Sequence, residues 1–563
     1  MLGFRSGWAL APLAAAVTAA LLVAACEQTP VARESVASVA VSPPTATVAV
    51  GRTERLTATA LDAAGNRLPG RTVVWSTSDS AVAQVNDTGL VTGVAVGAAT
   101  ITAAAEGRNG AAAITVTAAR VSGPLRVHPT NPRYFADATG RVVYLTGAHT
   151  WTNFVNSSPS DPPRAFDWSA YLTFLEQRGH NFIRLWRWEQ ARWSAETPDD
   201  LWFDPMPYRR TGPGTALDGK PKFDLTQFNQ AYFDRLRQRV IEAGQRGFYV
   251  SIMLFNGWSI ENKDLGIGNP WSGHPFHRGN NVNGIDGDPN NDGEGHETHT
   301  LQVPAVTALQ EAYVRRVIDA VNDLDNVLYE ISNESPGGGE SWQVHLITYI
   351  HQYEAGKPKQ HPVGMTHLWR GGNDADLFAS PADWIAPYGG GNTTDPQAAD
   401  GSKVILYDTD HVCGICGDEP LVWKSLTRGL NPQFMDPYDG AFPVSAQYDL
   451  ADPRWEQIRV NLGYARSYAN RVALAAMLPR EDLASTGYCL AKPTTQEAEY
   501  LVYLPTGGSV TVDLTGVGGT LAVEWFAPGT GETTPGGTTV GGATGTFTAP
   551  SSGDAVLYLR HVP

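Results

Sequence analysis

Between residues 121 and 479, short apolar runs of strand length alternate with amphipathic helical stretches. Residues 232–243 are typical of the helical stretches, because Phe233, Leu236, Val240 and Ile241 recur at helical spacing. The candidate strands are residues 142–147, 182–186, 248–254, 327–332, 362–366, 384–387, 404–407 and 433–435. Strands that alternate with helices build parallel sheets, and eight of them in roughly 360 residues predict a (β/α)8 TIM barrel with long loops.

Two regions of strictly alternating apolar and polar residues flank this central part. Residues 36–119 show the alternation at 45–50 and 113–117, and residues 481–563 show it at 500–504, 509–513 and 521–525. A period of two with Gly, Asn and Asp between the runs is typical of β-sandwiches. We therefore expect a multidomain chain, with the barrel at residues 121–480 between two sandwiches.

Both flanking regions resemble known domain families. The first resembles the bacterial Ig-like domains of intimin and invasin type, through residues 74–79, 89–93 and 97–101. The second resembles the collagen-binding-type domain that follows apiosidase-like barrels, through residues 500–504 and 525–532. The resemblances imply an Ig-like sandwich before the barrel and a second sandwich after it. Neither region holds a catalytic cluster, so the first is expected to be a spacer or a surface-binding module.

The first residues have the features of a targeting segment. Arg5 precedes an apolar stretch at residues 9–23, which is shorter than the roughly 20 residues of a membrane span. Residues 23–26, Val-Ala-Ala-Cys, resemble the lipobox of bacterial lipoprotein signal peptides. That resemblance implies removal of residues 1–25, lipidation of Cys26 and a tether at residues 26–35. The protein is then expected in the bacterial cell envelope, anchored in a membrane at the outer membrane or cell surface.

Charge and cysteine content exclude other classes of protein. The formal net charge is −16, and no basic cluster with interleaved aromatics offsets it, so we expect no nucleic-acid partner. Cys413, Cys416 and Cys489 remain after Cys26, without the second Cys-x-x-Cys that a zinc site would use. An exported chain favours a structural disulfide, with the pairing left open.

One strand run leads directly into a candidate catalytic group. Residues 327–332 precede Asn333, Glu334 and a Pro-Gly-Gly-Gly loop, so Glu334 is expected on the carboxyl-terminal rim, where such barrels place their active sites. Glycosidic cleavage needs a carboxylic acid that protonates the departing oxygen, and a Glu in a partly apolar cleft has its pKa raised enough to do so. Asn333 could bind the sugar's 2-hydroxyl.

The second carboxylate is sought after the seventh strand. Asp408 and Asp410 follow residues 404–407 and would face the same side of an extended strand. Either could serve as nucleophile or base, and the choice between them, like the choice between retention and inversion, stays open. Paired loop aspartates without a catalytic role are the alternative, and Glu189 is a reserve candidate.

These residues resemble the large clan of barrel glycoside hydrolases that includes cellulases and apiosidase-like enzymes. The resemblance rests on Asn333-Glu334 at the fourth strand end, on residues 181–186 with Arg184 at the second, and on His367 after the fifth. It implies hydrolysis of O-glycosidic bonds (EC 3.2.1.-), with Glu334 as acid/base and Arg184 near the nucleophile. The seventh strand departs from the clan, because no Glu ends it. A non-catalytic glycan-binding or adhesive surface lipoprotein is therefore the alternative.

Aromatic and histidine residues near strand ends suit a polysaccharide or glycan substrate, because sugars stack their CH faces on aromatic rings. Seven tryptophans lie there: Trp151, Trp186, Trp188, Trp258, Trp271, Trp369 and Trp423. We expect Trp151, Trp186, Trp369 and Trp423 in the substrate site, together with His149 and His367. Each one singly would more often be a packing residue.

An acidic loop follows a calcium-loop spacing. Six residues stand at positions 1, 3, 5, 7, 9 and 12 of that pattern: Asp286, Asp288, Asn290, Asp292, Glu294 and Glu297. The helices that flank an EF-hand are missing, so a solvated acidic loop is the alternative to a structural calcium site. The predicted reaction itself requires no cofactor.

Overall fold

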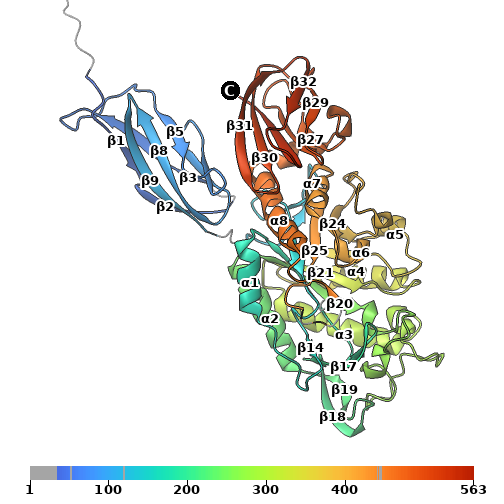
Figure 1. The fold of residues 1–563 in the computed structure, drawn as a ribbon. Helices are drawn as coiled ribbons and strands as arrows, with labels where there is room; N and C mark the ends of the chain where they lie inside the picture. The colour runs from blue at the N-terminus through green and yellow to red at the C-terminus, as the bar shows by residue number, and fades with distance from the viewer. Residues whose placement is uncertain (1–33, 51–52, 118–120, 441, 443–446, 563) are drawn as a thin grey trace, which may run out of the picture.

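The computed structural model describes residues 34–50, 53–117, 121–440, 442 and 447–562. Figure 1 shows three parts along the chain: an all-β N-terminal domain, a central α/β barrel, and a C-terminal domain of strands beside helices α7 (Glu419–Thr427) and α8 (Pro453–Arg471). The predicted leader and Cys26 lie outside the described residues. Among the helices that are described, none has the length and apolar character to span a membrane.

The N-terminal domain consists of nine strands in three sheets, arranged β1-β4, β2-β9-β8-β5 and β3-β7-β6. The two longest, β8 (Gly97–Ala105) and β9 (Arg108–Thr117), alternate buried and exposed side chains along most of their length. The inward residues Ile101, Ile114 and Val116 are at most 1% exposed. This confirms the predicted Ig-like sandwich. The remaining strands are β1 (Ser38–Ser42), β2 (Thr45–Ala49), β3 (Thr53–Arg55), β4 (Thr57–Leu61), β5 (Val74–Thr77), β6 (Ala83–Val85) and β7 (Leu90–Gly93).

The central part is a closed parallel barrel of eight strands, as predicted. In spatial order the strands are β13 (Gly147–His149), β15 (Phe182–Leu185), β20 (Tyr249–Asn256), β21 (Val327–Asn333), β22 (Val363–Thr366), β23 (Trp384–Ala386), β24 (Val404–Asp408) and β25 (Asn431–Met435). The closing pair is β13 with β25, through the register Gly147 to Gln433. The side chains of all eight strands are buried, so the barrel interior is a packed core.

The first predicted strand is misplaced. Residues 142–147 were expected in the barrel, but the barrel strand begins at Gly147. The preceding β12 (Val142–Val143) pairs antiparallel with β11 (Phe135–Ala136), which pairs with β10 (Arg126–Val127). This small sheet packs Phe135 and Val143 against Phe182, Leu328 and other residues at the amino ends of the barrel strands.

Helices follow the barrel strands and cover them. They are α1 (Trp168–Gln177), α2 (Gln230–Gln245), α3 (Pro304–Val321), α4 (Glu340–Glu354), α5 (Asp374–Ala379), α6 (Thr409–Val412), α7 and α8. The side chain of Asn229 accepts a hydrogen bond from Ala231 N and starts α2, whose Phe233, Leu236 and Val240 are buried. The predicted helix at residues 232–243 is thus confirmed.

Two long insertions reach over the carboxyl ends of the strands. Between β15 and α2 the chain forms β16 (Arg192–Ser194), β17 (Thr197–Asp204), β18 (Tyr208–Thr215) and β19 (Pro221–Phe228), and β14 (Asn156–Ser158) pairs with β17. Between β20 and α3 it forms the short helices η1 (Gly257–Ser259), η2 (Pro270–Gly273) and η3 (His296–His299).

The C-terminal domain has a six-stranded sheet, β26-β27-β28-β33-β30-β31, and a β29-β32 pair. Trp423 on α7 packs against Tyr503 and Phe526 of this domain, and the apolar core of the barrel continues into it without a break. The strands are β26 (Leu478–Pro479), β27 (Cys489–Lys492), β28 (Glu499–Leu504), β29 (Ser509–Asp513), β30 (Thr520–Ala527), β31 (Glu532–Val540), β32 (Thr544–Thr548) and β33 (Ala555–His561).

Candidate active site at the carboxyl end of the barrel

A cavity of about 350 Å³ opens where the barrel strands end. Glu334, Asp410 and Glu196 bring three carboxyl groups to its wall. Its other walls are Trp151, Trp186, Trp258, Trp369, Tyr388, His411, Val412, Cys413, Gly414, Ile415, Met435 and Tyr448. A larger cavity of about 490 Å³ lies between the N-terminal domain and α1 and α8, beside the amino ends of β15 and β20. Of these two cavities, the smaller one joins carboxyl groups to an aromatic wall at the strand ends.

Glu334 leaves the end of β21 in a left-handed conformation, with a φ of 40°. A side chain at Gly257 would collide with its backbone, since a Cβ there would lie 2.0 Å from Glu334 O. The Trp258 indole donates a hydrogen bond to Oε2 of Glu334, and Lys263 Nζ donates to its backbone oxygen at 2.9 Å. The residues that follow β20 therefore fix both the backbone and the carboxyl group of Glu334.

The environment of Glu334 favours the protonated acid. Burial, followed by the nearby Asp410 carboxylate, raises the pKa of Glu334 to about 8, although Lys263 and the Trp258 hydrogen bond oppose the shift. Glu334 is 6% exposed, and its Oε1 lies 4.0 Å from Nδ1 of His411. A carboxylic acid that stays protonated at neutral pH is suited to proton donation.

Arg184 at the end of β15 joins the polar side chains beneath the cavity. It donates two hydrogen bonds to Glu330, at 2.6 and 2.7 Å, and one to Asp410 at 2.6 Å. The three buried carboxylates around Arg184 are those of Glu330, Asp408 and Asp410. Their burial is tolerated because the guanidinium donates hydrogen bonds to their oxygens. Its full set of polar contacts is Glu330, Asn333, Asp408, Asp410 and His411.

The two strand-seven aspartates have different surroundings. Asp408 accepts a hydrogen bond from Asp410 N at the start of α6, and its Oδ1 lies 2.9 Å from His149 Nε2. His149 and Arg184 hold the pKa of Asp408 well below its usual range, against the effect of burial. Burial raises the pKa of Asp410, while Arg184 opposes the shift. Asp410 lines the cavity and Asp408 lies beneath it.

Glu196 was not expected from the sequence. It comes from the turn between β16 and β17 and lines the cavity beside Asp410 and Glu334. Its Oε2 is buried without a hydrogen-bond partner, and burial followed by those two carboxylates raises its pKa to about 8. No spacing rule links this turn to strands four and seven. Glu330 could have been found from the sequence, because a charged residue within an apolar strand run indicates a buried polar site.

Of the tryptophans expected in the substrate site, Trp151, Trp186 and Trp369 line the cavity. Trp423 does not, and that expectation is corrected. Its indole is fully buried, donates to Asn461 Oδ1 at 2.7 Å and packs against the C-terminal domain. Trp258 lines the cavity, while Trp188 lies behind Trp186 with ring centroids 6.0 Å apart.

Several expected polar groups are occupied by the protein itself. Asn333 is fully buried, accepts from Arg184 Nη2 at 2.7 Å, and does not line the cavity. His149 is 1% exposed and stacks on Trp186, so it supports the wall instead of facing a substrate. His367 pairs with Asp374 at 3.0 Å beside Tyr388.

The reserve candidate, Glu189, lies outside the cavity. Its carboxylate is 2% exposed and accepts a hydrogen bond from Asn256 N at 2.8 Å, and it lies near Arg187, His274 and His299. Arg187 and the two histidines hold the pKa of Glu189 well below its usual range despite burial. Through these contacts Glu189 connects the β15–α2 insertion to the β20–α3 insertion.

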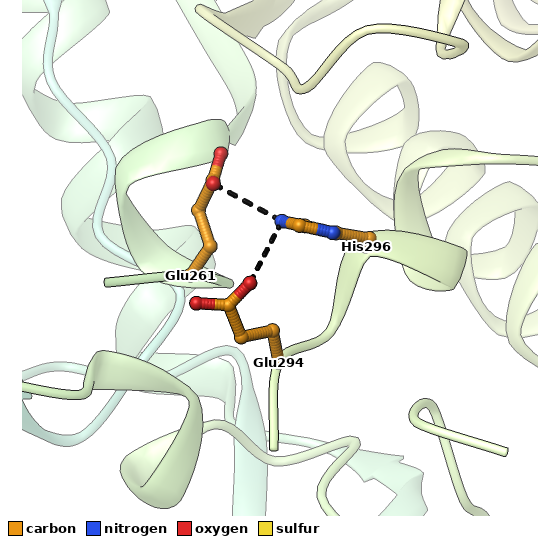
Figure 2. Close-up of side chains that lie close together, drawn as sticks. All are labelled: Glu261, Glu294 and His296. Atoms are coloured by element: carbon orange, nitrogen blue, oxygen red, sulfur yellow. Dashed lines mark hydrogen bonds and ion pairs between the residues drawn. The ribbon is translucent and has the colours of Figure 1, made fainter. Parts of the chain in front are cut away.

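The calcium-loop expectation is also corrected. Asp288 accepts backbone hydrogen bonds from Asp292 and Gly293, and Asp286 accepts one from Asp288. The oxygens of Asp286, Asp288, Asn290 and Asp292 therefore accept hydrogen bonds within their own loop, while Glu297 Oε2 is buried without a hydrogen-bond partner. Among the described residues, the acidic and histidine side chains whose ligand atoms come close enough to hold one metal ion are Glu261, Glu294 and His296, shown in Figure 2.

A disulfide closes the cavity rim. Cys413 is bonded to Cys416, directly after α6, and Cys413, Gly414 and Ile415 all line the cavity. This confirms the expected structural disulfide and gives its pairing. Cys489 is free and buried on β27.

Three segments of the chain match known sequence families. Residues 35–118 match the bacterial Ig-like domains (group 2), and residues 169–371 match a domain of unknown function (DUF6298). Residues 480–560 match a family provisionally described as the collagen-binding domain of a collagenase. A curated relative, ice-binding protein 1 of Shewanella frigidimarina, is 31% identical over 128 residues, which is 21% of this chain and 14% of that protein.

Solved structures share the fold at low identity. A glycoside hydrolase family 5 protein from Bacteroides vulgatus aligns with a TM-score of 0.53 and 13% identity, covering 78% of this chain and 93% of its own. A second Bacteroides vulgatus protein, provisionally described as a glycoside hydrolase, aligns with a TM-score of 0.51 and 12% identity over 92% of this chain and 100% of its own. The chain thus combines a bacterial Ig-like domain, a closed eight-stranded barrel with the fold of these proteins, and a C-terminal domain of the collagenase-associated family.

Proposed function

We propose that this protein hydrolyses O-glycosidic bonds in an extracellular polysaccharide or glycan. The observation that carries the proposal is the pairing of Glu334 and Asp410 on one aromatic cavity at the carboxyl end of a barrel. Asp410 accepts a hydrogen bond from the Arg184 guanidinium, which favours the carboxylate against the effect of burial, whereas Glu334 has no guanidinium hydrogen bond, so Asp410 is suited to act as carboxylate and Glu334 as acid. Glycosidic cleavage requires both forms together.

In the proposed reaction, the Glu334 acid gives its proton to the glycosidic oxygen as the bond to the anomeric carbon breaks. The bonding electron pair leaves with that oxygen. The Asp410 carboxylate either bonds to the anomeric carbon, in which case water then displaces it while giving a proton to Glu334, or it takes a proton from the water that attacks that carbon and afterwards releases this proton to solvent. Water supplies the hydroxyl of the new reducing end, and one proton returns to Glu334, so the enzyme is unchanged at the end of the cycle.

The surrounding residues support this assignment. The cavity tryptophans, Trp151, Trp186, Trp258 and Trp369, offer flat faces to the CH groups of a sugar ring. The unpartnered Glu196 oxygen gives one hydroxyl of that ring a fixed hydrogen-bond partner. Asp408, His149 and Asn333 act one layer below, because each contacts Arg184 or Asp408 and none lines the cavity.

Location is a separate part of the proposal. A lipid on Cys26 would hold the enzyme at the outer membrane or cell surface, where a polymer too large to enter the cell is accessible. Labelling with a radioactive fatty acid tests this, because Cys26→Ala should abolish the label. Label that persists in this variant would contradict the anchor.

The function is tested by Glu334→Gln, which keeps the shape of the side chain and removes the acid. We expect release of reducing sugar from a panel of polysaccharides and nitrophenyl glycosides to fall by about 10²- to 10⁴-fold, the usual contribution of a general acid. Glu497→Gln, in an exposed glutamate of the C-terminal domain, is the matched control. A folded Glu334→Gln protein that releases sugar at the wild-type rate would falsify the assignment, and glycan binding without release by the wild type would favour the adhesive alternative.

A further inference from the structure

Three side chains outside the cavity meet at one point between two loops of the β20–α3 insertion (Figure 2). Glu261 follows η1, while Glu294 and His296 lie more than thirty residues later, at the start of η3. Glu261 is 8% exposed, and the other two are partly exposed, so the group is open to solvent on one side. The hydrolytic reaction proposed above uses none of the three.

The three side chains present one nitrogen and two oxygen atoms that lie close together. His296 Nε2 lies 3.0 Å from Glu261 Oε2 and 3.2 Å from Glu294 Oε2, and all three ligand atoms lie within 4.8 Å of one another. Neighbouring ligands at about 2.1 Å from a metal, separated by angles of about 90° to 110°, are about 3.0 to 3.4 Å apart. Both measured contacts fall in that range.

The second oxygen of each carboxylate is held by the protein. Glu261 Oε1 lies 2.6 Å from Lys263 Nζ, and Glu294 Oε1 accepts a hydrogen bond from Asn262 N at 3.3 Å. Each carboxylate is thereby oriented with Oε2 toward the imidazole. Outer contacts that orient carboxylate ligands are a regular feature of metal sites, and here they are one ion pair, at Glu261, and one hydrogen bond, at Glu294.

We propose that Glu261, Glu294 and His296 bind a divalent transition-metal ion, with Zn²⁺ as its representative. One imidazole nitrogen and two carboxylate oxygens suit such an ion better than Ca²⁺, which prefers six to eight oxygen ligands. In the bound state the imidazole is neutral, and its Nε2 lone pair and one oxygen of each carboxylate face the metal. Water completes the coordination.

Such an ion would brace the edge of the cavity. Lys263 contacts Glu261, donates to the backbone oxygen of Glu334, and lies 5.5 Å from the ring centres of both Trp258 and Trp369. The metal would tie the loop of Glu261 to the segment before η3 and keep Lys263 and Trp258 in place. The proposed role is structural positioning, and metal binding itself does not depend on the proposed hydrolysis.

The test is calorimetric titration of the chelator-treated, tag-free full chain with Zn²⁺ at neutral pH. We expect one ion per chain and a higher melting temperature, with Ca²⁺ at least tenfold weaker. His296→Gln and Glu294→Gln should each lower Zn²⁺ affinity by at least tenfold, with unchanged circular dichroism. The matched control is His345→Gln, because His345 is as exposed as His296 and pairs with one glutamate, Glu311, at 2.9 Å; this variant should bind Zn²⁺ like the wild type.

The proposal is overturned if Zn²⁺ produces neither heat nor a melting shift, or if His296→Gln and Glu294→Gln bind it as tightly as the wild type does. Neither result would bear on the role of Glu334 in hydrolysis, because sugar release is measured separately and none of these variants alters a cavity residue. Loss of sugar release in Glu334→Gln with unchanged Zn²⁺ binding is the expected converse.

Discussion

The amino and carboxyl ends of the barrel interior differ in the residues that they place on the same strand faces, apolar at the amino end and charged at the carboxyl end. On β15, β21 and β24, an apolar residue is followed two positions later by a charged one: Phe182 by Arg184, Leu328 by Glu330, and Leu406 by Asp408. Residues two apart in a strand share a face, so an apolar layer directly supports a charged layer. The amino end stabilises the fold, and the carboxyl end carries the ionised groups of the cavity.

The strongest test of this difference between the two ends is to remove a charge from the carboxyl end. We expect Asp410→Ala to lower kcat/KM by about 10²- to 10⁴-fold with little loss of folding, because the cavity leaves room for water beside Arg184. Added azide should restore part of the rate by taking the place of the carboxylate, and the product should be a glycosyl azide. Asp376→Ala, at an exposed position on α5, is the control. If Asp410→Ala keeps full activity while Asp408→Ala loses it, the roles of the two aspartates are reversed.

A substitution in the apolar layer should show the opposite behaviour. Leu328→Ala removes a fully buried side chain from the amino end of β21, and we expect unfolding free energy to fall by about 2 to 5 kcal/mol. Denaturant titration measures the loss, and kcat/KM of the folded protein should stay close to the wild-type value. Lost activity at unchanged stability would show that the two layers are not separable.

The pH profile tests the ionisation of the carboxyl end. With the pKa of Glu334 near 8, the acid form predominates below pH 8, and kcat/KM should fall as pH rises, to roughly one tenth of its plateau at pH 9. Trp258→Phe removes a hydrogen bond that favours the ionised form, so the alkaline limb should move to higher pH. An alkaline limb that does not move in this variant would argue against Glu334 as its source.

The smallest expected effect concerns Glu196. Glu196→Gln keeps a hydrogen-bonding group of the same size, and we expect KM to rise by about two- to tenfold, the value of one neutral hydrogen bond, with kcat nearly constant. Steady-state kinetics on the best polysaccharide substrate measure it. A collapse of kcat comparable with that of Asp410→Ala would instead place Glu196 among the catalytic groups.

Much of the barrel could be predicted because its strands are apolar runs with clear ends. Seven of the eight strands lie within two residues of their expected bounds, and Glu334 stands at the end of β21 as expected. The first strand failed because Val142 and Val143 are as apolar as a barrel strand, yet they pair antiparallel with β11. Apolar periodicity does not specify the partner of a strand.

The site was predictable only where strand ends supply it. Glu196 and Lys263 come from insertions without periodic pattern, so their place in the fold depends on loop conformation. Trp423 follows the seventh strand in sequence, but α7 turns it toward the C-terminal domain. The acidic loop has the spacing of a calcium loop, yet the carboxylate oxygens of Asp288 accept hydrogen bonds from the backbone N–H groups of Asp292 and Gly293. In each case tertiary contacts decide where a local pattern points.

The continuous packing of Trp423 against Tyr503 and Phe526 bears on how the chain can be dissected. The N-terminal domain has two apolar clusters of its own and could be exchanged like a detachable module. A cut between the barrel and the C-terminal domain would instead expose aromatic faces of α7 and α8 to water. Helix α7 begins just after the disulfide-closed loop beside Asp410. A truncation that disturbs α7 would therefore also disturb the cavity wall that this loop forms.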